Sequence, residues 1–226
     1  ESYVINNKND IELFKKNYDK NYRKDKLYIL KKNIQKKKGI LISNNLSEIL
    51  SATDYKIIQE YVPNLFLLKN RKINLRLYFI AICHKNTKNG FLYKYGKCIY
   101  TNKPYKGTNI NNLSLNDIRE QHLTSVNLDV NIYNEYPETL NELEKYLGNY
   151  KYTKLWSNIV KLLGDVMKAI RHHIGNLDKL KKAYTFQIFG TDIVFTNDMK
   201  PYLLEFNKGA DLSYKTNNDM IMKDKL

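Results

Sequence analysis

The stretch from Leu155 to Ile170 constrains the fold most, because its apolar residues recur at the spacing of a long amphipathic helix. The apolar residues of its predicted buried face are Leu155, Ile159, Leu162, Leu163, Val166, Met167 and Ile170. A shorter helix is predicted over residues 10–19, with Asp10 as its N-cap, and a helical turn over residues 47–51. The chain therefore contains helices of very different length, separated by segments of another type.

Those other segments are typical of strands. Residues 73–83 alternate as a long strand does, and residues 184–195 and 201–207 form two strands joined by a turn at Asn197 and Asp198. Residues 91–95 and 98–101 are predicted to form a hairpin that turns at Gly96. Further strand-like runs cover residues 26–31, 40–42 and 56–62. Strands and helices in mixed order predict an α+β or α/β protein, with a seam near residues 64–70.

The composition indicates a folded, basic protein. Of the 226 residues, 42% are hydrophobic and 12% aromatic, which is enough to bury a core and excludes a disordered chain. The formal net charge of +15 favours an acidic partner: nucleic acid, an anionic membrane surface, a nucleotide or an acidic peptide. The same charge would follow from the Lys-, Asn-, Ile- and Tyr-rich composition of an AT-rich genome.

Two cysteines fit a reducing compartment. There is neither an apolar run of roughly 20 residues nor a visible signal peptide. These features predict a cytoplasmic protein.

The last two predicted strands carry a candidate metal site. In a hairpin, Asp192 and Glu205 can lie opposite each other, and Glu205 shares a face with Asn207 because side chains alternate along a strand. Two carboxylates and an amide oxygen form a set of hard ligands that suits Mg²⁺. The alternative is a pair of strand-end acids that face water.

Cationic residues on other strands form a second candidate site. Lys31 ends an apolar run, and Lys72 and Arg76 share one face of a strand. Arg76 has apolar neighbours and therefore needs an anionic partner, unless it is a surface arginine at a strand end. The basic loop of residues 36–39, which includes Lys38, could close over phosphates, although it lacks the P-loop pattern and a solvated loop is the simpler interpretation.

Taken in order, these segments resemble the tubulin–tyrosine ligase family, a branch of the ATP-grasp ligases. The residues that carry the resemblance are Glu1–Ile5, Tyr28–Lys31, Lys38–Ser43, Ile58–Tyr61, Arg71–Arg76, His122–Thr124, Phe186–Asp192 and Leu203–Asn207. The resemblance implies an α+β, ATP-grasp fold of two lobes with ATP between them. Residues 1–68 would belong to the central lobe and residues 69–226 to the C-terminal lobe, and the family's N-terminal lobe is expected to be absent.

The resemblance also implies a role for each site residue. Lys31 and the loop with Lys38 would hold phosphates; Gln59, Glu60, Tyr61 and Val62 would form the hinge that meets adenine; Lys72, Asn74, Thr124 and Asp192 would contact the nucleotide. Arg76 would stabilise the transferred phosphoryl group. Asp192, Glu205 and Asn207 would bind Mg²⁺, with Lys31 and Arg76 gripping the triphosphate from the other side. Arg76, Lys31 and Glu205 are the expected catalytic residues.

The chemistry implied by the family is ligation in two steps. An acceptor carboxylate attacks the γ-phosphate of ATP, and the amine of a free amino acid then captures the acyl phosphate. The acceptor would be tubulin or another acidic tail, which complements a chain of charge +15. Tyrosine is the first expectation for the added residue, and glutamate is the alternative. A non-catalytic module that binds nucleotide or tubulin, and a basic nucleic-acid binder, are the other hypotheses.

Three positions depart from the family pattern. Asn74 stands where the family has Asp, Ser125 where it has Asn, and Ile99 where it has an arginine expected to engage the acyl phosphate or the tail. Lys97 or Lys103 is a candidate substitute for that missing cation. These departures leave the non-catalytic hypothesis open.

Overall fold

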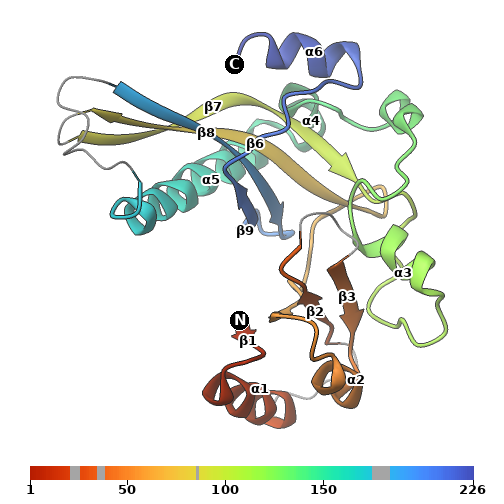
Figure 1. Ribbon diagram of the computed structural model, residues 1–226. Helices are drawn as coiled ribbons and strands as arrows, with labels where there is room; N and C mark the ends of the chain where they lie inside the picture. Colours follow the sequence, from red (N-terminus) through yellow and green to blue (C-terminus); the bar gives the residue numbers. More distant parts are fainter. Residues whose placement is uncertain (21–25, 35–38, 85–86, 175–183) are drawn as a thin grey trace.

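The computed structural model describes residues 1–20, 26–34, 39–84, 87–174 and 184–226. The predicted phosphate-binding Lys38 lies outside the described residues, together with Lys36 and Lys37. The described part contains two antiparallel sheets with helices on their faces, which is an α+β arrangement (Figure 1). Among the described residues, none of the helices combines the length and the apolar character that crossing a membrane requires.

The first sheet is small and comes from the start of the chain. Its strands are β1 (Ser2–Val4), β4 (Ile57–Glu60), β2 (Tyr28–Lys31) and β3 (Ile40–Ser43), in that spatial order and all antiparallel. Helices α1 (Lys8–Lys20) and α2 (Leu46–Ser51) pack on it. Phe14 of α1 lies edge-on to Tyr3 and Tyr28, with ring centroids 5.3 and 5.2 Å away. These aromatic contacts fix α1 on the sheet.

The predicted N-cap of the first helix is wrong. Helix α1 begins at Lys8, and the side-chain oxygen of Asn7 accepts hydrogen bonds from the backbone amides of Asn9 and Asp10 at 3.0 and 3.3 Å. Asp10 lies inside the first turn, where its carboxylate accepts the backbone amide of Val4 at 2.8 Å. Asn7 caps the helix because its short side chain lies just ahead of the unpaired amides of the first turn.

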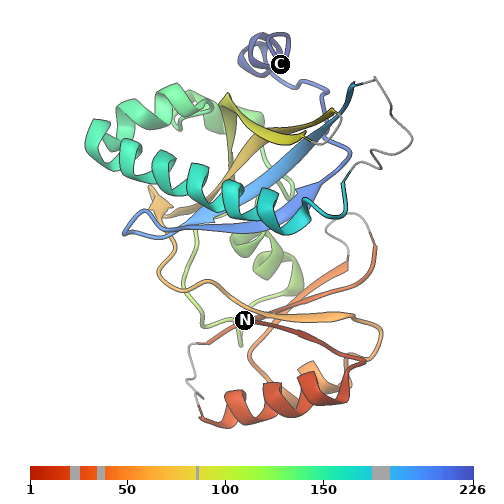
Figure 2. The ribbon, with the colours of Figure 1, turned by 90° about the vertical axis from the view of Figure 1, so that its left-hand side faces the viewer.

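The second sheet is larger and holds the long strands. It consists of β7 (Thr87–Tyr100), β6 (Arg71–His84), β8 (Tyr184–Phe195) and β9 (Pro201–Asn207), each paired antiparallel with the next. The short β5 (Leu67–Leu68) pairs with the start of β6. Helices α4 (Leu140–Leu147) and α5 (Asn149–Ile170) cover one face, as Figure 2 shows. The strand predictions for residues 73–83, 184–195 and 201–207 are confirmed.

The long helix is also confirmed, and it begins earlier than its apolar pattern does. Leu155, Ile159, Leu163 and Met167 of α5 are buried. They pack against side chains from the odd-numbered positions of β6, which include Leu75, Leu77, Phe79 and Ala81. Even-numbered positions of β6 therefore project from the opposite face of the sheet.

The predicted hairpin at Gly96 is wrong. Strand β7 runs unbroken from Thr87 to Tyr100, and the chain reverses instead between His84 and Thr87. A Cβ atom on Gly96 would lie 2.5 Å from Leu77 Cδ2 and 2.8 Å from the backbone oxygen of Arg76. Glycine is needed here because β6 and β7 approach closely, beside an irregularity in their register between Leu77 and Phe79.

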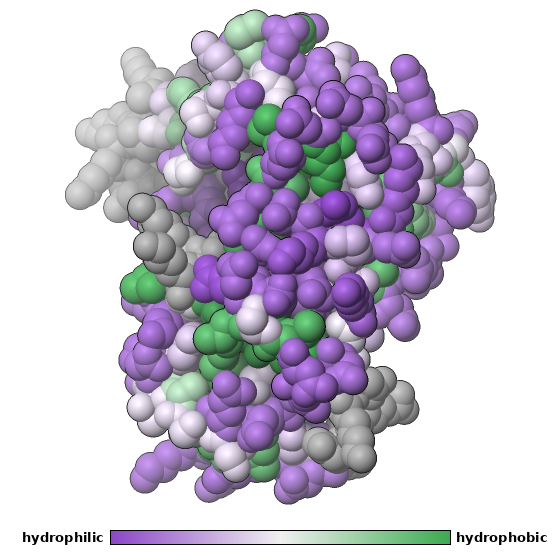
Figure 3. Space-filling view, turned by 90° about the vertical axis from the view of Figure 1, so that its right-hand side faces the viewer, coloured by the Kyte–Doolittle hydropathy of each residue, from purple (hydrophilic) through white to green (hydrophobic). Residues whose placement is uncertain are grey.

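A core between the sheets joins the two halves of the molecule. Leu27 and Ile42 of the first half pack there with Tyr61, Val194 and Ile118 of helix α3 (Leu115–His122). On the mostly hydrophilic face in Figure 3, hydrophobic residues gather in the lower half, and a second group lies in the upper half. A short 3₁₀-helix η2 (Val130–Asn134) follows α3, and helix α6 (Asn217–Lys223) lies beside β7 at the far side of the larger sheet.

Candidate functional site

The candidate site is centred on three charged residues in one row across the second sheet. Arg76 of β6 lies directly opposite Asp192 of β8, and Asp192 lies opposite Glu205 of β9. Directly opposed residues of antiparallel strands project from the same face, and here it is the face turned away from α5. The prediction that Asp192 and Glu205 lie opposite each other is confirmed. We call Arg76, Asp192 and Glu205 the Arg76 row.

Arg76 and Asp192 form a two-pronged ion pair. Arg76 Nε donates to Asp192 Oδ1 at 2.6 Å and a terminal guanidinium nitrogen donates to Oδ2 at 3.0 Å. Burial by itself would lower the pKa of Arg76, but the Asp192 carboxylate outweighs it and the pKa is raised. The expectation of an anionic partner for Arg76 is confirmed. The expectation that Arg76 grips the triphosphate from the other side of the site is wrong, because Arg76 lies beside Asp192 on the neighbouring strand of the same sheet.

Lys31 is a cation of the other sheet whose pKa is influenced by a member of the row. It ends β2 and is half-buried. Burial lowers the pKa of Lys31, and the negative charge of Glu205 partly opposes that effect. The charge of Glu205 on β9 therefore acts on Lys31, although the two residues belong to different sheets.

A buried polar cluster surrounds Lys72, on the face of β6 that also carries Arg76. Lys72 Nζ donates to the backbone oxygen of His122 at 3.0 Å and to the Tyr61 hydroxyl at 3.4 Å. His122 Nδ1 lies 3.2 Å from the same hydroxyl. Burial, with a smaller contribution from the Lys72 charge, lowers the pKa of His122 to about 4, so the imidazole is neutral at physiological pH. The cluster links the end of the first sheet, α3 and β6.

Asn74 carries a buried acceptor atom that accepts no hydrogen bond from the described residues. Its side chain is 7% exposed, lies between Lys72 and Arg76 on the same face of β6, and its Oδ1 has no hydrogen-bond partner among the described residues. Buried amide oxygens are almost always hydrogen-bonded in folded proteins. A ligand with a hydroxyl or amino donor, such as a nucleoside, would satisfy this atom. Asn74 is thus a feature of this structure that fits a bound nucleotide.

The remaining predicted nucleotide residues divide into two groups. Tyr61 and Thr124 are buried, and Val62 packs against the core between the sheets. The side chains of Gln59 and Glu60 are bound within the first half of the chain: Gln59 Nε2 donates to Ser2 Oγ of β1 at 3.1 Å, and Glu60 accepts Lys26, which precedes β2, at 2.7 Å. A contact between adenine and these two hinge residues would therefore have to use backbone groups.

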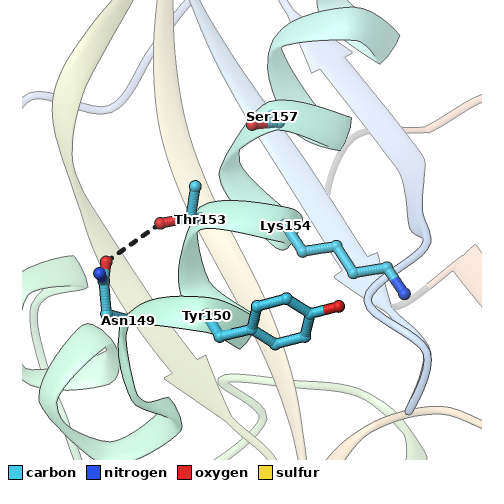
Figure 4. A pocket seen from close by; sticks show the side chains of 5 residues that line it. All are labelled: Asn149, Tyr150, Thr153, Lys154 and Ser157. Carbon is cyan, nitrogen blue, oxygen red and sulfur yellow. Dashed lines mark hydrogen bonds between the residues drawn. The ribbon is translucent and has the colours of Figure 1, made fainter.

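A separate hollow of about 420 Å³ lies on the outer surface of α5. It is lined by Asn149, Tyr150, Thr153, Lys154 and Ser157, and Thr153 Oγ1 donates to Asn149 Oδ1 at 3.1 Å (Figure 4). Helix α5 covers the face of the sheet that is opposite to the Arg76 row. This hollow is consequently not part of the candidate site.

With the geometry established, comparison with known proteins decides the family. The family model described as "Tubulin-tyrosine ligase family" matches residues 2–226. The chain belongs to the tubulin–tyrosine ligase family. The resemblance inferred from the sequence is therefore confirmed.

Several proteins similar to this chain are named as tubulin polyglutamylases. "Tubulin polyglutamylase TTLL7" of Xenopus tropicalis is 29% identical over 211 residues, which cover 84% of this chain and 22% of the relative. "Tubulin polyglutamylase TTLL6" of Mus musculus is 26% identical, covering 90% and 26%. A "Probable beta-tubulin polyglutamylase" of Tetrahymena thermophila is 23% identical, covering 93% and 19%. The chain spans about a fifth to a quarter of the length of these relatives.

Both lysines that are candidate substitutes for the family's arginine form ion pairs within the chain. Ile99 lies opposite Asn74, so an apolar side chain borders the site face at that position. Lys97 lies opposite Arg76, but its ammonium binds Glu138 at 3.0 Å and Asp219 at 3.1 Å. Lys103 binds Asp117 and Glu120 instead. Both lysine charges are thus already paired with carboxylates of the chain, and a substitution for the arginine stays a prediction.

The donor atoms of Asp192, Glu205 and Asn207 fit the Mg²⁺ that the sequence resemblance implies. Asp192, Glu205 and Asn207 offer hard oxygens, and a site with two carboxylates leaves coordination positions for phosphate and water oxygens. Among the described residues, no group of three or more His, Cys, Asp or Glu side chains could hold a metal ion. A cation held here would therefore depend on phosphate oxygens as well as on the chain. Sequence reasoning found these carboxylates but named His122 only as part of a motif.

Proposed function

We propose that this chain is the ATP- and Mg²⁺-dependent ligase core of an enzyme that adds glutamate to the acidic tail of tubulin. The observation that carries the proposal is the Arg76 row, and the charge of its Glu205 also influences the pKa of Lys31 in the other sheet. Family membership supports the ligase class. The names of the relatives favour glutamate over the tyrosine that the sequence first indicated.

In this proposal the two sheets enclose ATP as the two lobes of an ATP-grasp enzyme, with residues 1–68 and 69–226 as the lobes. Adenosine lies against Tyr61, Val62, Lys72 and Thr124, and one of its donors satisfies Asn74 Oδ1. Lys31, with Lys38 from the basic loop, binds phosphates. Asp192, Glu205 and Asn207 would hold Mg²⁺, which would neutralise charge on the triphosphate. Lys72, Asn74 and Arg76, in that order along β6, then follow the bound nucleotide from its nucleoside to its γ-phosphate.

Arg76 acts where charge moves during the first step. An oxygen of the acceptor carboxylate forms a bond to the γ-phosphorus while the bond to the ADP oxygen breaks, and the guanidinium stabilises the transferring group. The bidentate contact with Asp192 holds the planar guanidinium in place before the substrate arrives. In the second step the amine of glutamate attacks the acyl carbon, loses a proton and releases phosphate. Positioning and charge neutralisation supply most of the rate enhancement.

The acceptor suits the charge of the chain. A tail rich in glutamate is attracted to a chain of net charge +15, and such steering weakens as salt rises. Nucleic acid would be attracted by the same net charge. However, the Arg76 row contains two carboxylates, which suit a metal-bound triphosphate and do not suit a nucleic-acid backbone. We therefore infer an acidic protein tail as the partner.

The experiment combines the protein with ATP, Mg²⁺, isotopically labelled glutamate or tyrosine, and an acidic tail peptide, and reads mass gain on the peptide. A gain of glutamate residues is expected, and Glu205→Ala should abolish it together with Mg²⁺-dependent ATP binding. Asp165→Asn, in an exposed pair on α5, is the matched control and should change neither. Unchanged Mg-ATP affinity in Glu205→Ala would contradict the proposed site.

Ile99 favours a second candidate, a non-catalytic module that binds nucleotide or tubulin. An isoleucine cannot neutralise an acyl phosphate, and the nearby lysines are compensated. The same assay separates the two functions, because the module would bind Mg-ATP without any mass gain on the peptide. If so, Ile99→Arg should produce a gain that the wild type lacks.

A further inference from the structure

Four charged side chains from three segments form a nearly buried cluster at the β7 end of the Arg76 row. Lys97 of β7 binds Glu138, which precedes α4, and Asp219 of α6; Asp219 also binds Lys223 at 3.0 Å. Their side chains are 12%, 5%, 3% and 9% exposed, respectively. Two positive and two negative charges balance, which makes burial of the set tolerable. We call these residues the four-charge cluster.

Hydrogen bonds extend the cluster along the C-terminal part of the chain. Thr216 Oγ1 donates to Glu138, Asn218 Nδ2 donates to Glu138 at 3.2 Å, and the backbone amide of Lys215 donates to Asp219 at 3.3 Å. The Tyr93 hydroxyl of β7 donates to the backbone oxygen of Met222 at 3.1 Å. Helix α6 is therefore held on β7 by charged groups that are almost out of contact with water, unlike an ordinary surface ion pair.

Between β9 and α6 the chain folds back over the face of the Arg76 row. A Cβ atom on Gly190 would lie 3.5 Å from Ala210 and 3.8 Å from Arg76 Cδ, so Ala210 and Arg76 pack over the same glycine. Gln187 Nε2 donates to the backbone oxygen of Lys208 at 2.5 Å. Figure 1 shows this stretch crossing the sheet from β9 to α6. We call residues 208–216 the crossing segment.

The crossing segment lies on the far side of Arg76 from the nucleoside. Lys72, Asn74, Arg76 and Tyr78 follow one another on one face of β6, with about 7 Å between successive members. Lys72 and Asn74 belong to the proposed nucleoside end. Tyr78 pairs with Gly190, over which Ala210 packs. In an in-line displacement the acceptor approaches from the side opposite the leaving ADP, which here is the side of Tyr78.

From this arrangement we propose that Lys97 is a positioning residue: the four-charge cluster latches α6 to β7 and thereby holds the crossing segment as the acceptor-side wall of the site. The inference rests on the proposed ligase function. It assigns Lys97 a role other than replacing the family arginine. Its charge binds the protein's own C-terminal helix, while Arg76 beside it serves the substrate.

The test compares Asp219→Asn and Lys97→Met with Lys97→Arg as the conservative variant and Asp165→Asn as the control. In the first two variants, hydrogen exchange of residues 208–224 should speed up, and kcat/KM for the acceptor peptide should fall by about tenfold or more. Mg-ATP affinity should stay within about twofold, because the latch touches none of its proposed ligands. Lys97→Arg should retain most of the acceptor kcat/KM.

Two results would overturn the proposal: unchanged exchange of the crossing segment, or equal losses of acceptor and Mg-ATP binding. Asn218→Ala, which removes only one hydrogen bond to Glu138, serves if the other variants fail to fold, and should show the same pattern at smaller size. Exchange and Mg-ATP binding are readable even if the wild type adds no amino acid. The latch and the ligase function can therefore fail separately.

Discussion

Acidification should destabilise this protein through His122, and the size of the effect follows from its burial. The imidazole is 0% exposed, and burial beside the Lys72 charge lowers its pKa from 6.5 to about 4. Between those values the unfolded chain binds a proton that the folded chain does not, so stability falls as the pH falls from 6.5 to 4. At about 1.4 kcal/mol for each pH unit, the loss reaches about 2 kcal/mol at pH 5 and about 3 kcal/mol below pH 4.

The assay is urea unfolding at pH 7 and pH 5 for the wild type and for His122→Gln. Glutamine keeps a polar group beside the Tyr61 hydroxyl but cannot titrate, so the variant should lose about 2 kcal/mol less than the wild type over this interval. His172→Gln, which removes an exposed histidine after α5, should leave the wild-type pH dependence in place. Equal losses in wild type and His122→Gln would refute the assignment of a buried neutral imidazole.

Three further variants test other parts of the structure. Lys31→Met should raise the melting temperature of the ligand-free protein, because it removes a cation whose pKa is lowered by burial. It should also weaken Mg-ATP binding roughly tenfold or more, as measured by calorimetry. A lower melting temperature with unchanged affinity would contradict both roles. Gly96→Ala should cost about 1–3 kcal/mol in urea unfolding, since the new methyl group meets Leu77 and the Arg76 backbone; a neutral result would show that β6 and β7 can separate freely. Leu163→Ala should lower the free energy of unfolding by about 2–5 kcal/mol in the same assay, because it opens a cavity under α5. A loss below about 1 kcal/mol would mean that the helix is not packed as described.

Local patterns predicted most of the elements that build the second sheet. The period of Leu155, Ile159 and Leu163 indicates a helix whichever surface it covers, and alternation along residues 73–83 indicates a strand. Gly96 defeated the same reasoning, because glycine suits both a turn and a close approach of two strands. Only the position of Leu77 and the Arg76 backbone separates those alternatives.

The sequence likewise predicts some of the contacts in the candidate site and not others. Asp192 and Glu205 could be paired from the sequence, since a short turn between two strands limits their register. The salt bridge from Arg76 to Asp192 spans 116 positions of the chain, and no local pattern encodes such a contact. The compensation of Lys97 by Glu138 and Asp219, and the orphaned Oδ1 of Asn74, likewise depend on which strands are neighbours.

By itself, the sequence determined the mixed helix-and-strand architecture, the family and the hard-oxygen residues of the last two strands, because periodicity and motif order act over short stretches of chain. The tertiary structure alone decided that Arg76 shares a row with the carboxylates, that Glu205 influences the pKa of Lys31 in the other sheet, and that His122 is buried and neutral. Charge and burial act through space, so their balance at a site is set only when distant segments come together.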